Sequence, residues 1–270
     1  MGFAWFKGHG TENDFILLPD HDGSIHGDLD PAFVARLCDR RTGIGADGVL
    51  RVIRSTVAGH NSPGEWFMDY RNADGSISEM CGNGVRVFAR HLVNEGLVEG
   101  NDFSVHTRDG LKFVTVTDDA VTVDMGGYTV GHHSKVGVTG HTWSALEVNT
   151  GNPHAVAIVG SLHDAGSLTD QPSFDTGVFP AGVNIEFVER VRDGVVRMRV
   201  HERGSGETRS CGTGACAVGI ALAAADHAAH PATYEIHVPG GVLNVEVDKD
   251  RTMLTGPAEI VAGGTMEWFV

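Results

Sequence analysis

Apolar residues repeat with a helical period in three segments of the chain. Residues 31–40 begin with proline and show one apolar face, which predicts a short helix. Residues 85–93 predict a second one-sided helix, and Gly96 provides a stop. Residues 215–229 are apolar on nearly every side before Pro231. A helix with this pattern is buried all round, so we expect sheet wrapped around it.

Alternating apolar and polar residues predict strands that pair as hairpins. The segments FSVHTRDGLKFVTV from Phe103 and YEIHVPGGVLNVEV from Tyr234 both alternate. Each is interrupted by a turn signal, RDG at 108–110 and PGG at 239–241. We therefore expect two similar hairpins.

These hairpins belong to a longer internal duplication. NADGSISEMCGNGVRVFAR starts at Asn72 and ERGSGETRSCGTGACAVGI at Glu202, and each reaches a Cys-Gly-x-Gly nine residues later, at Cys81 and Cys211. The two cysteines lie 130 residues apart, and the starts of the two hairpin segments lie 131 residues apart. The two halves therefore align along their length with one short gap. This period is too long for a solenoid and predicts two related domains, each with one cysteine corner.

Each Cys-Gly-x-Gly marks a point where a loop becomes a helix. The first N–H groups of a helix lack intrahelical partners, and the helix dipole is positive there. Such an end can hold a carboxylate, and it lowers the pKa of a thiol from its usual value of about 8.5. Two such corners predict a thiolate that removes an α-proton and a thiol that protonates the opposite face. Cys38 and Cys216 lie in apolar helical patterns, which predicts core packing.

Composition narrows the function classes. The formal net charge of −15 argues against a nucleic-acid-binding protein. No stretch approaches 18 apolar residues, and the N-terminus lacks a charged leader followed by an apolar run, so we expect a cytoplasmic protein without membrane association. Four cysteines in 270 residues are not a disulfide framework.

The cysteine, histidine and lysine patterns bear on metal and cofactor chemistry. No Cys-x-x-Cys pair occurs, and no His-x-x-x-His pattern stands beside the cysteines, so we expect no metal site. A pyridoxal enzyme needs a Schiff-base lysine, and this chain offers only Lys7, Lys112, Lys135 and Lys249, with no identifiable phosphate loop. We therefore expect no cofactor.

Eight motifs in chain order resemble the diaminopimelate epimerase family. They are HGTENDF at 9–15, RRTGIGADG at 40–48, RNADGS at 71–76, MCGNGVR at 80–86, NTGNPHAV at 149–156, GVNIEF at 182–187, HERGSGETRSCGTGA at 201–215 and HVPGG at 237–241. The resemblance implies an α/β (α+β) fold of two pseudosymmetric domains, residues 1–123 plus 256–270 and residues 124–255. Each domain would be a curled, mostly antiparallel sheet around a central helix, with the active site in the cleft between them.

The resemblance also implies an activity and a set of residues. The activity is cofactor-independent epimerisation of LL-2,6-diaminopimelate to the meso form, in lysine and peptidoglycan precursor biosynthesis, by a homodimer. Cys81 and Cys211 would be catalytic, and His154 would support a catalytic thiol. The implied contacts to this small-molecule substrate are Asn13, Asn72, Gly82, Asn83, Asn152, Asn184, Glu202, Arg203, Gly212 and Thr213.

The sequence differs from the family pattern at two positions, and two alternative functions remain open. Many family members have glycine where this chain has Glu12, and glutamine where it has Gly48, so one distal substrate contact is missing or replaced. Proline racemase-like enzymes also use two cysteines but typically have histidine after the first Cys-Gly, where this chain has Asn83. That favours an acyclic, two-ended substrate. A thiol redox or metal-binding protein is the alternative from another class.

Overall fold

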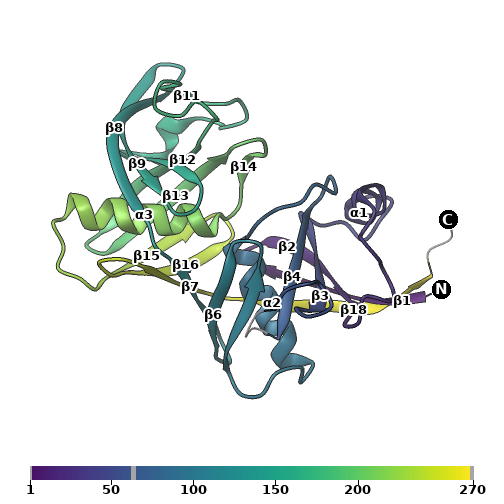
Figure 1. Cartoon of the computed structure of the whole chain (residues 1–270). Coiled ribbons are helices and arrows are strands. Elements are labelled where there is room, and N and C mark those ends of the chain that lie inside the picture. Colours follow the sequence, from purple (N-terminus) through teal and green to yellow (C-terminus); the bar gives the residue numbers. More distant parts are fainter. Residues whose placement is uncertain (1, 62–64, 268–270) are drawn as a thin grey trace. The chain divides into compact units, whose positions relative to one another are not determined.

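The computed structural model describes residues 2–61 and 65–267. Over these residues strands predominate, accompanied by three α-helices and one 3-10 helix. The chain divides into two compact units, Met1–Val123 with Pro257–Val270, and Asp124–Gly256. Figure 1 shows that the strands of each unit curl around one long helix, as the resemblance implies.

The first unit contains one curled sheet. Its strands pair in the order β18-β1-β2-β3-β4-β5-β6-β7. Their bounds are β1 Gly2–Gly10, β2 Asn13–Pro19, β3 Gly48–Arg54, β4 Trp66–Asn72, β5 Asp102–Thr107, β6 Gly110–Val116, β7 Val121–Gly126 and β18 Glu259–Glu267. The β2–β3 and β4–β5 pairs are parallel, and the others are antiparallel. Parallel neighbours need crossovers, which α1 (Pro31–Cys38) and α2 (Gly82–Asn94) supply.

The second unit repeats this plan. Its strands pair in the order β8-β9-β10-β12-β13-β15-β16-β17. Their bounds are β8 Thr129–Val138, β9 His141–Asn149, β10 Pro153–Val159, β12 Asn184–Arg192, β13 Val195–Glu202, β15 Ala232–Val238, β16 Gly241–Val247 and β17 Thr252–Gly256. The short strands β11 (Ser173–Phe174) and β14 (Gly206–Thr208) pair with β8 and β13. The 3-10 helix η1 (Leu162–Ala165) and α3 (Gly212–Ala225) occupy the crossovers.

Parallel and antiparallel pairs follow one another in the same sequence in both units. In the first unit the parallel pairs are β2–β3 and β4–β5. In the second unit the corresponding parallel pairs are β10–β12 and β13–β15. Both predicted hairpins form, because Thr107 pairs with Gly110 and Val238 with Gly241. The duplication predicted from the sequence is therefore present in the strand topology.

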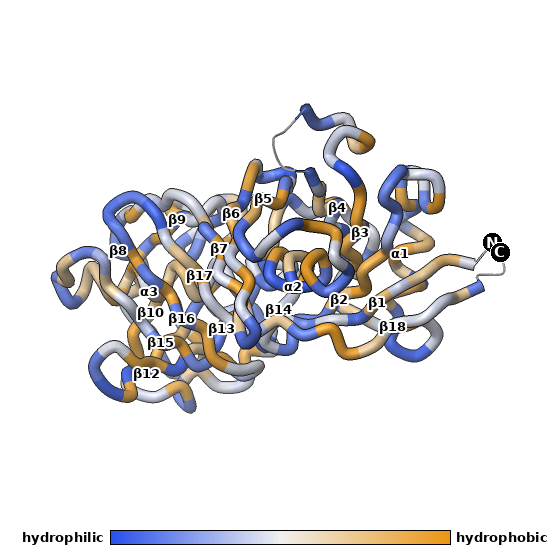
Figure 2. Tube along the Cα trace, turned by 90° about the horizontal axis from the view of Figure 1, so that it is seen from below, coloured by the Kyte–Doolittle hydropathy of each residue, from blue (hydrophilic) through white to orange (hydrophobic). Residues whose placement is uncertain are grey.

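Helix α3 is buried all round, as its apolar pattern predicts, whereas α2 is buried on more sides than its one-sided pattern predicts, because Arg86, Val87 and His91 are buried too. Residues 212–223 of α3 are all buried, and the helix packs against β9, β10, β12, β15, β16 and β17. Helix α2 packs mainly against β1, β2, β6 and β18. In Figure 2 hydrophobic stretches of the tube alternate with hydrophilic ones, as expected for strands joined by polar turns.

The predicted helix ends need correction. Helix α3 stops at Ala225 rather than 229, because the N–H groups of His227 and Ala228 bond back to carbonyls in its last turn, at 3.3 and 3.0 Å. His227 takes a left-handed conformation (φ 49°) to close this cap, which is usually the place of glycine. Helix α1 ends at Cys38 because Asp39 is extended. Helix α2 starts at Gly82, three residues before the predicted start, and Gly96 ends it as expected.

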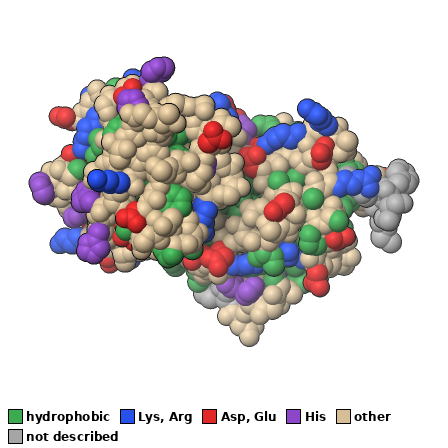
Figure 3. Space-filling model, turned by 90° about the horizontal axis from the view of Figure 1, so that it is seen from above, with side chains coloured by type: hydrophobic (Ala, Val, Ile, Leu, Met, Phe, Trp, Pro, Cys, Tyr) green, Lys and Arg blue, Asp and Glu red, His purple; other side chains and the backbone are tan. Residues whose placement is uncertain are grey.

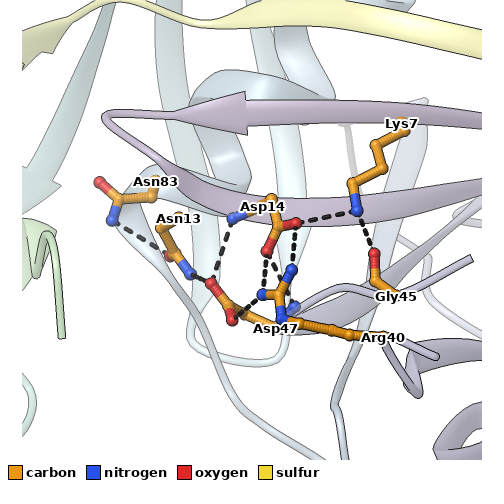
Figure 4. Close-up of polar contacts among 7 residues, drawn as sticks. All are labelled: Lys7, Asn13, Asp14, Arg40, Gly45, Asp47 and Asn83. Atoms are coloured by element: carbon orange, nitrogen blue, oxygen red, sulfur yellow. Dashed lines mark hydrogen bonds and ion pairs between the residues drawn. The ribbon is translucent and has the colours of Figure 1, made fainter. Parts of the chain in front are cut away.

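An ion-pair cluster joins β1, β2 and the loop between α1 and β3 (Figure 4). Asp14 accepts two hydrogen bonds from the Arg40 guanidinium, at 2.7 and 3.0 Å, and its carboxylate lies 2.9 Å from Lys7 Nζ. Arg40 also contacts Asp47 at 2.7 Å. Burial alone would raise the pKa of Asp14, but the hydrogen bonds from Arg40 and Lys7 outweigh it and lower this pKa to about 2. We call these four residues the Asp14 cluster.

Surface charge and helix hydrophobicity bear on two classes that the sequence argued against, nucleic-acid-binding proteins and membrane-associated proteins. On the face drawn in Figure 3, Lys and Arg side chains are interspersed with Asp and Glu. Within residues 2–61 and 65–267, no helix has the length and apolar character needed to cross a membrane.

Gly219 tests the packing of α3 on its sheet. A Cβ at this position would lie 2.8 Å from Val245 Cγ1 and 3.2 Å from Val245 Cβ. We expect Gly219→Ala to lower the free energy of unfolding by about 1–2 kcal/mol, because overlap exceeds the gain in helix propensity. Urea denaturation measures this. In a Val245→Ala background the same change should cost less, and an equal cost in both backgrounds would contradict the packing argument.

Acid titration tests the Asp14 cluster. Because folding depresses the Asp14 pKa, its contribution to stability is present above about pH 4 and is lost as the pH falls towards 2. We expect Asp14→Asn to destabilise the protein by about 1–2 kcal/mol at pH 7, after allowance for solvent screening. The two proteins should converge in stability near pH 2. A constant difference from pH 7 to pH 2 would show that the carboxylate charge contributes nothing.

Candidate active site

In the first unit, Cys81 is the N-cap residue of α2. Its extended backbone (φ −143°, ψ 121°) leads directly into the helix, and its carbonyl accepts the N–H of Val85 at 2.8 Å. Gly82 and Asn83, in the first turn, are buried. The expectation that this thiol sits at a helix start is confirmed.

Asn13 lies beside this corner. The Cys81 Sγ donates to Asn13 Oδ1 at 3.6 Å, and Asn83 Nδ2 donates to the same oxygen at 3.1 Å. The tight β1–β2 turn places Asn13 here, with Thr11 and Glu12 at φ 49° and 62°. A left-handed conformation suits glycine, so Glu12 occupies a backbone position that favours glycine.

Asn72 and Gly48 are two further positions of the first unit that the sequence motifs single out. The Asn72 amide donates to Ser76 Oγ at 3.0 Å. At Gly48 a Cβ would lie 2.6 Å from the Arg71 carbonyl oxygen. A side chain at this position would therefore require the neighbouring backbone to shift.

In the second unit, Cys211 is the N-cap residue of α3, with φ −128° and ψ 116°. Its Sγ accepts the Gly214 N–H at 3.3 Å and lies 3.5 Å from Thr213 Oγ1. Cys81 makes no such capping hydrogen bond through its sulfur. The two corners share a backbone shape but present different partners to their thiols.

A chain of hydrogen bonds extends from this corner. Asn152 Nδ2 donates to Thr213 Oγ1 at 3.4 Å, and Asn152 Oδ1 lies 2.9 Å from His154 Nε2. The other ring nitrogen of His154 lies 2.7 Å from Glu186 Oε1, and both of these side chains are fully buried. His154 lies on β10 and Glu186 on β12, which are paired as parallel neighbours, with His154 opposite Asn184, two residues before Glu186. The structure therefore joins Asn152, His154, Thr213 and Cys211.

The remaining predicted contacts of the second unit lie at strand ends. Asn184 Nδ2 donates to the Pro153 carbonyl at 3.2 Å, and Asn184 Oδ1 accepts the Arg203 N–H at 2.9 Å. The Arg203 guanidinium donates to the Ala181 carbonyl at 3.0 Å. Glu202 accepts a hydrogen bond from the Thr208 hydroxyl.

The protonation of Cys211 differs from the sequence-based expectation. Burial raises the pKa of this thiol well above its usual value, and the negative charges of Glu202 and Glu186 raise it further. The hydrogen bonds from Thr213 and Gly214 act in the opposite direction, as predicted for a helix start, but they are smaller effects. Cys211 is therefore a protonated thiol at neutral pH.

Two residues of these clusters were not predicted. Glu186 belongs to the GVNIEF motif, where one carboxylate interrupts an apolar strand, and that interruption signals a buried partner. A Cβ at Gly214 would lie 2.7 Å from Glu186 Oε1, so the second glycine of this Cys-Gly-x-Gly makes room for the carboxylate. Asp47 accepts a hydrogen bond from Asn13 Nδ2 at 2.8 Å. No local pattern links Asp47 with Asn13.

The other two cysteines lie in the core, as expected. Cys38 packs in an apolar cluster with Val34 and Leu37, and burial raises its pKa to about 12. Cys216 is fully buried in α3. In the described part of the chain, no three His, Cys, Asp or Glu side chains are grouped so as to hold a metal ion.

A separate cavity of about 610 Å³ lies in the first unit and contains none of the predicted site residues. Its lining includes an ion-pair network in which Asp69 contacts Arg71 at 3.0 Å and Arg108 at 2.5 Å. Burial raises the pKa of Asp69, but hydrogen bonds from these arginines outweigh it and lower the value. We interpret this network as structural.

Comparison with known proteins identifies the family. The family model described as diaminopimelate epimerase matches residues 5–130 and 146–261. The chain is 51% identical to diaminopimelate epimerase of Streptomyces coelicolor, over 98% of this chain and 95% of that protein. It is 47% identical to diaminopimelate epimerase of Corynebacterium glutamicum, over 97% of each chain.

Solved structures with low sequence identity share the fold. A PhzF-family phenazine biosynthesis protein of Bacillus anthracis has a TM-score of 0.74 at 16% identity, covering 99% of this chain and all of that one. A hydroxyproline epimerase from Agrobacterium vitis has a TM-score of 0.69 at 16% identity, covering 98% and 92%. Family model, close relatives and fold agree, and this chain belongs to the diaminopimelate epimerase family.

Proposed function

We propose that this protein interconverts LL- and meso-2,6-diaminopimelate without a cofactor, with Cys81 and Cys211 as its two acid/base groups. One observation carries the proposal. Each unit places a cysteine at the N-cap of its central buried helix, at equivalent points of the same strand topology. Family membership supports the substrate, because the relatives at 44–51% identity carry the name diaminopimelate epimerase.

The chemistry follows from the helix starts. An α-proton is very weakly acidic, so the negative charge that develops on its removal must be stabilised. Backbone N–H groups at Gly82–Asn83 and Gly212–Thr213 would bind the α-carboxylate, onto which this charge delocalises. One thiolate removes the proton from the α-carbon, and the other thiol gives its proton to the opposite face. The reverse reaction exchanges the two roles.

The resting state of the thiols constrains this mechanism. Cys211 keeps its proton because its pKa is raised, and Cys81 directs its S–H to Asn13. Catalysis needs one thiolate and one thiol, so one proton must leave as the substrate binds. Two thiolates in one dry site would repel each other, and their titration would belong to the pair.

The polar residues suit a substrate with an amino-acid unit at each end. Glu202 would accept from the distal ammonium, and Arg203 would bind the distal carboxylate. The side-chain amides of Asn13, Asn72, Asn152 and Asn184 would complete the binding site. His154 would support a catalytic thiol through Asn152.

We further propose the biological setting that the resemblance implies. The two compact units would be two domains with one catalytic cysteine each, in a cytoplasmic homodimer that supplies lysine and peptidoglycan precursors.

Solvent isotope exchange tests the activity. With purified protein in D₂O and no added cofactor, we expect one deuterium to enter diaminopimelate at the α-carbon during epimerisation, because the proton donated to the product comes from a thiol that exchanges with solvent. Mass spectrometry or proton NMR follows the label. Proline and hydroxyproline serve as controls and should remain unlabelled. The proposal fails if diaminopimelate takes up no label.

Substitution of each thiol tests the two-base assignment. Cys81→Ser and Cys211→Ser should each lower kcat by about 10²–10⁴-fold, because a serine hydroxyl is a much weaker acid than a thiol and does not ionise near neutral pH to supply the base. Cys216→Ala, on the same helix as Cys211 but in the core, is the matched control and should retain activity. Near-normal turnover in either serine variant would overturn the assignment.

A further inference from the structure

The amide of Asn13 is held on both sides by side chains from other parts of the first unit (Figure 4). Its Nδ2 donates to Asp47 Oδ2 at 2.8 Å. Its Oδ1 accepts from Asn83 Nδ2 at 3.1 Å and from the Cys81 thiol at 3.6 Å. Asn13 therefore links Asp47 to Cys81.

Asp47 determines which way this amide points. Its carboxylate accepts from Asn13 Nδ2, from the Asp14 N–H at 3.2 Å and from Arg40 Nη2 at 2.7 Å. All three partners are donors, and an ionised carboxylate can only accept. The amide must present its NH₂ group to Asp47, so its carbonyl oxygen faces Cys81. The Asn83 amide, the other side-chain partner named above, can present either its NH₂ or its oxygen, so it does not fix the orientation of Asn13 as a carboxylate does.

The orientation matters for the thiol. A carbonyl oxygen accepts a hydrogen bond from a protonated thiol, whereas it presents only lone pairs to a thiolate. The opposite holds at Cys211, where the Gly214 N–H donates to the sulfur. The side-chain carbonyl of Asn13 is thus an acceptor for the Cys81 sulfur, whereas the Gly214 backbone is a donor to the Cys211 sulfur.

We infer that Asp47 is a positioning residue that fixes the Asn13 amide and thereby holds the resting Cys81 in its protonated form. Its importance for catalysis rests on the proposed function, in which Cys81 is one of the two acid/base groups. Asp47 does this through Asn13, and contact with substrate is not required.

Other charged groups surround the same corner. Asp14, Arg40 and Lys7 belong to the Asp14 cluster. On α2, Arg86 donates to the Gly82 carbonyl at 3.4 Å and to Thr11 Oγ1 at 3.2 Å. A test must therefore separate the hydrogen-bond path through Asn13 from the direct effect of removing a charge.

The rate of Cys81 alkylation by iodoacetamide, measured against pH by peptide mass spectrometry, gives this separation without any substrate. In Asp47→Asn the amide of Asn13 gains freedom to turn its NH₂ towards sulfur, so the pH profile should move to lower pH. Alkylation at pH 7 should be about 3- to 10-fold faster, the effect of one hydrogen bond. In an Asn13→Ala background, Asp47→Asn should add less than about twofold, since coupled residues give non-additive effects.

Asp14→Asn is the matched control. It removes one carboxylate of the same cluster but leaves the bond from Asn13 to Asp47 in place, so the alkylation rate at pH 7 should stay within about twofold of the wild type. Thermal unfolding checks that each variant is folded, and Asp47→Ser replaces Asp47→Asn if that variant does not fold.

Two results would overturn the inference. One is an unchanged profile in the Asp47 variant, and the other is an equal shift with and without Asn13, which would indicate charge alone. The readout needs no turnover. A protein that fails to epimerise diaminopimelate would therefore refute the proposed function without deciding the role of Asp47.

Discussion

The start of a buried helix leaves backbone N–H groups that the helix itself cannot satisfy, and the candidate site depends on this constraint. Both α2 and α3 begin inside their sheets, with the first three residues buried. In α3 the Cys211 sulfur accepts one of these groups, from Gly214. A carboxylate suits the remaining donors. The place where a thiol caps a helix is therefore also the place where an amino acid would bind.

Opposing effects act on the Cys211 thiol, and their balance decides its state. The helix start and its hydrogen bonds favour the thiolate, whereas burial and two nearby carboxylates favour the thiol. Burial is the largest effect, because a charge in the protein interior loses more hydration than two hydrogen bonds return. A thiol that keeps its proton is a weak nucleophile. The same state makes Cys211 less prone to oxidation than a thiolate would be.

The duplicated scaffold keeps its backbone plan but varies its polar partners. At Gly84 of the first corner a Cβ would make ordinary contacts, 3.4 Å or more from its neighbours, whereas at Gly214 it would collide with Glu186. Cys81 faces the Asn13 carbonyl, and Cys211 faces an N–H group. The repeated backbone plan therefore does not require repeated side-chain surroundings at the two cysteines.

The sequence by itself determined the features that depend on neighbouring residues. Glycine, proline and the apolar period located the hairpin turns at 108–110 and 239–241 and the start of α1, because these obey local backbone preferences, whereas α2 and α3 both begin three residues before the apolar runs at 85 and 215. The end of α3 was misjudged, since His227 closes the helix in a conformation that sequence patterns reserve for glycine. Family motifs supplied the candidate site residues.

Only the tertiary structure decided how those residues are held. Asp47 meets Asn13 across 34 positions of sequence, and Glu186 meets His154 across 32, because strands and loops distant in the chain become neighbours. The raised pKa of Cys211 likewise comes from burial and from carboxylates on other elements. Hydrogen-bond polarity and desolvation depend on which groups meet in three dimensions, and no local pattern contains that information.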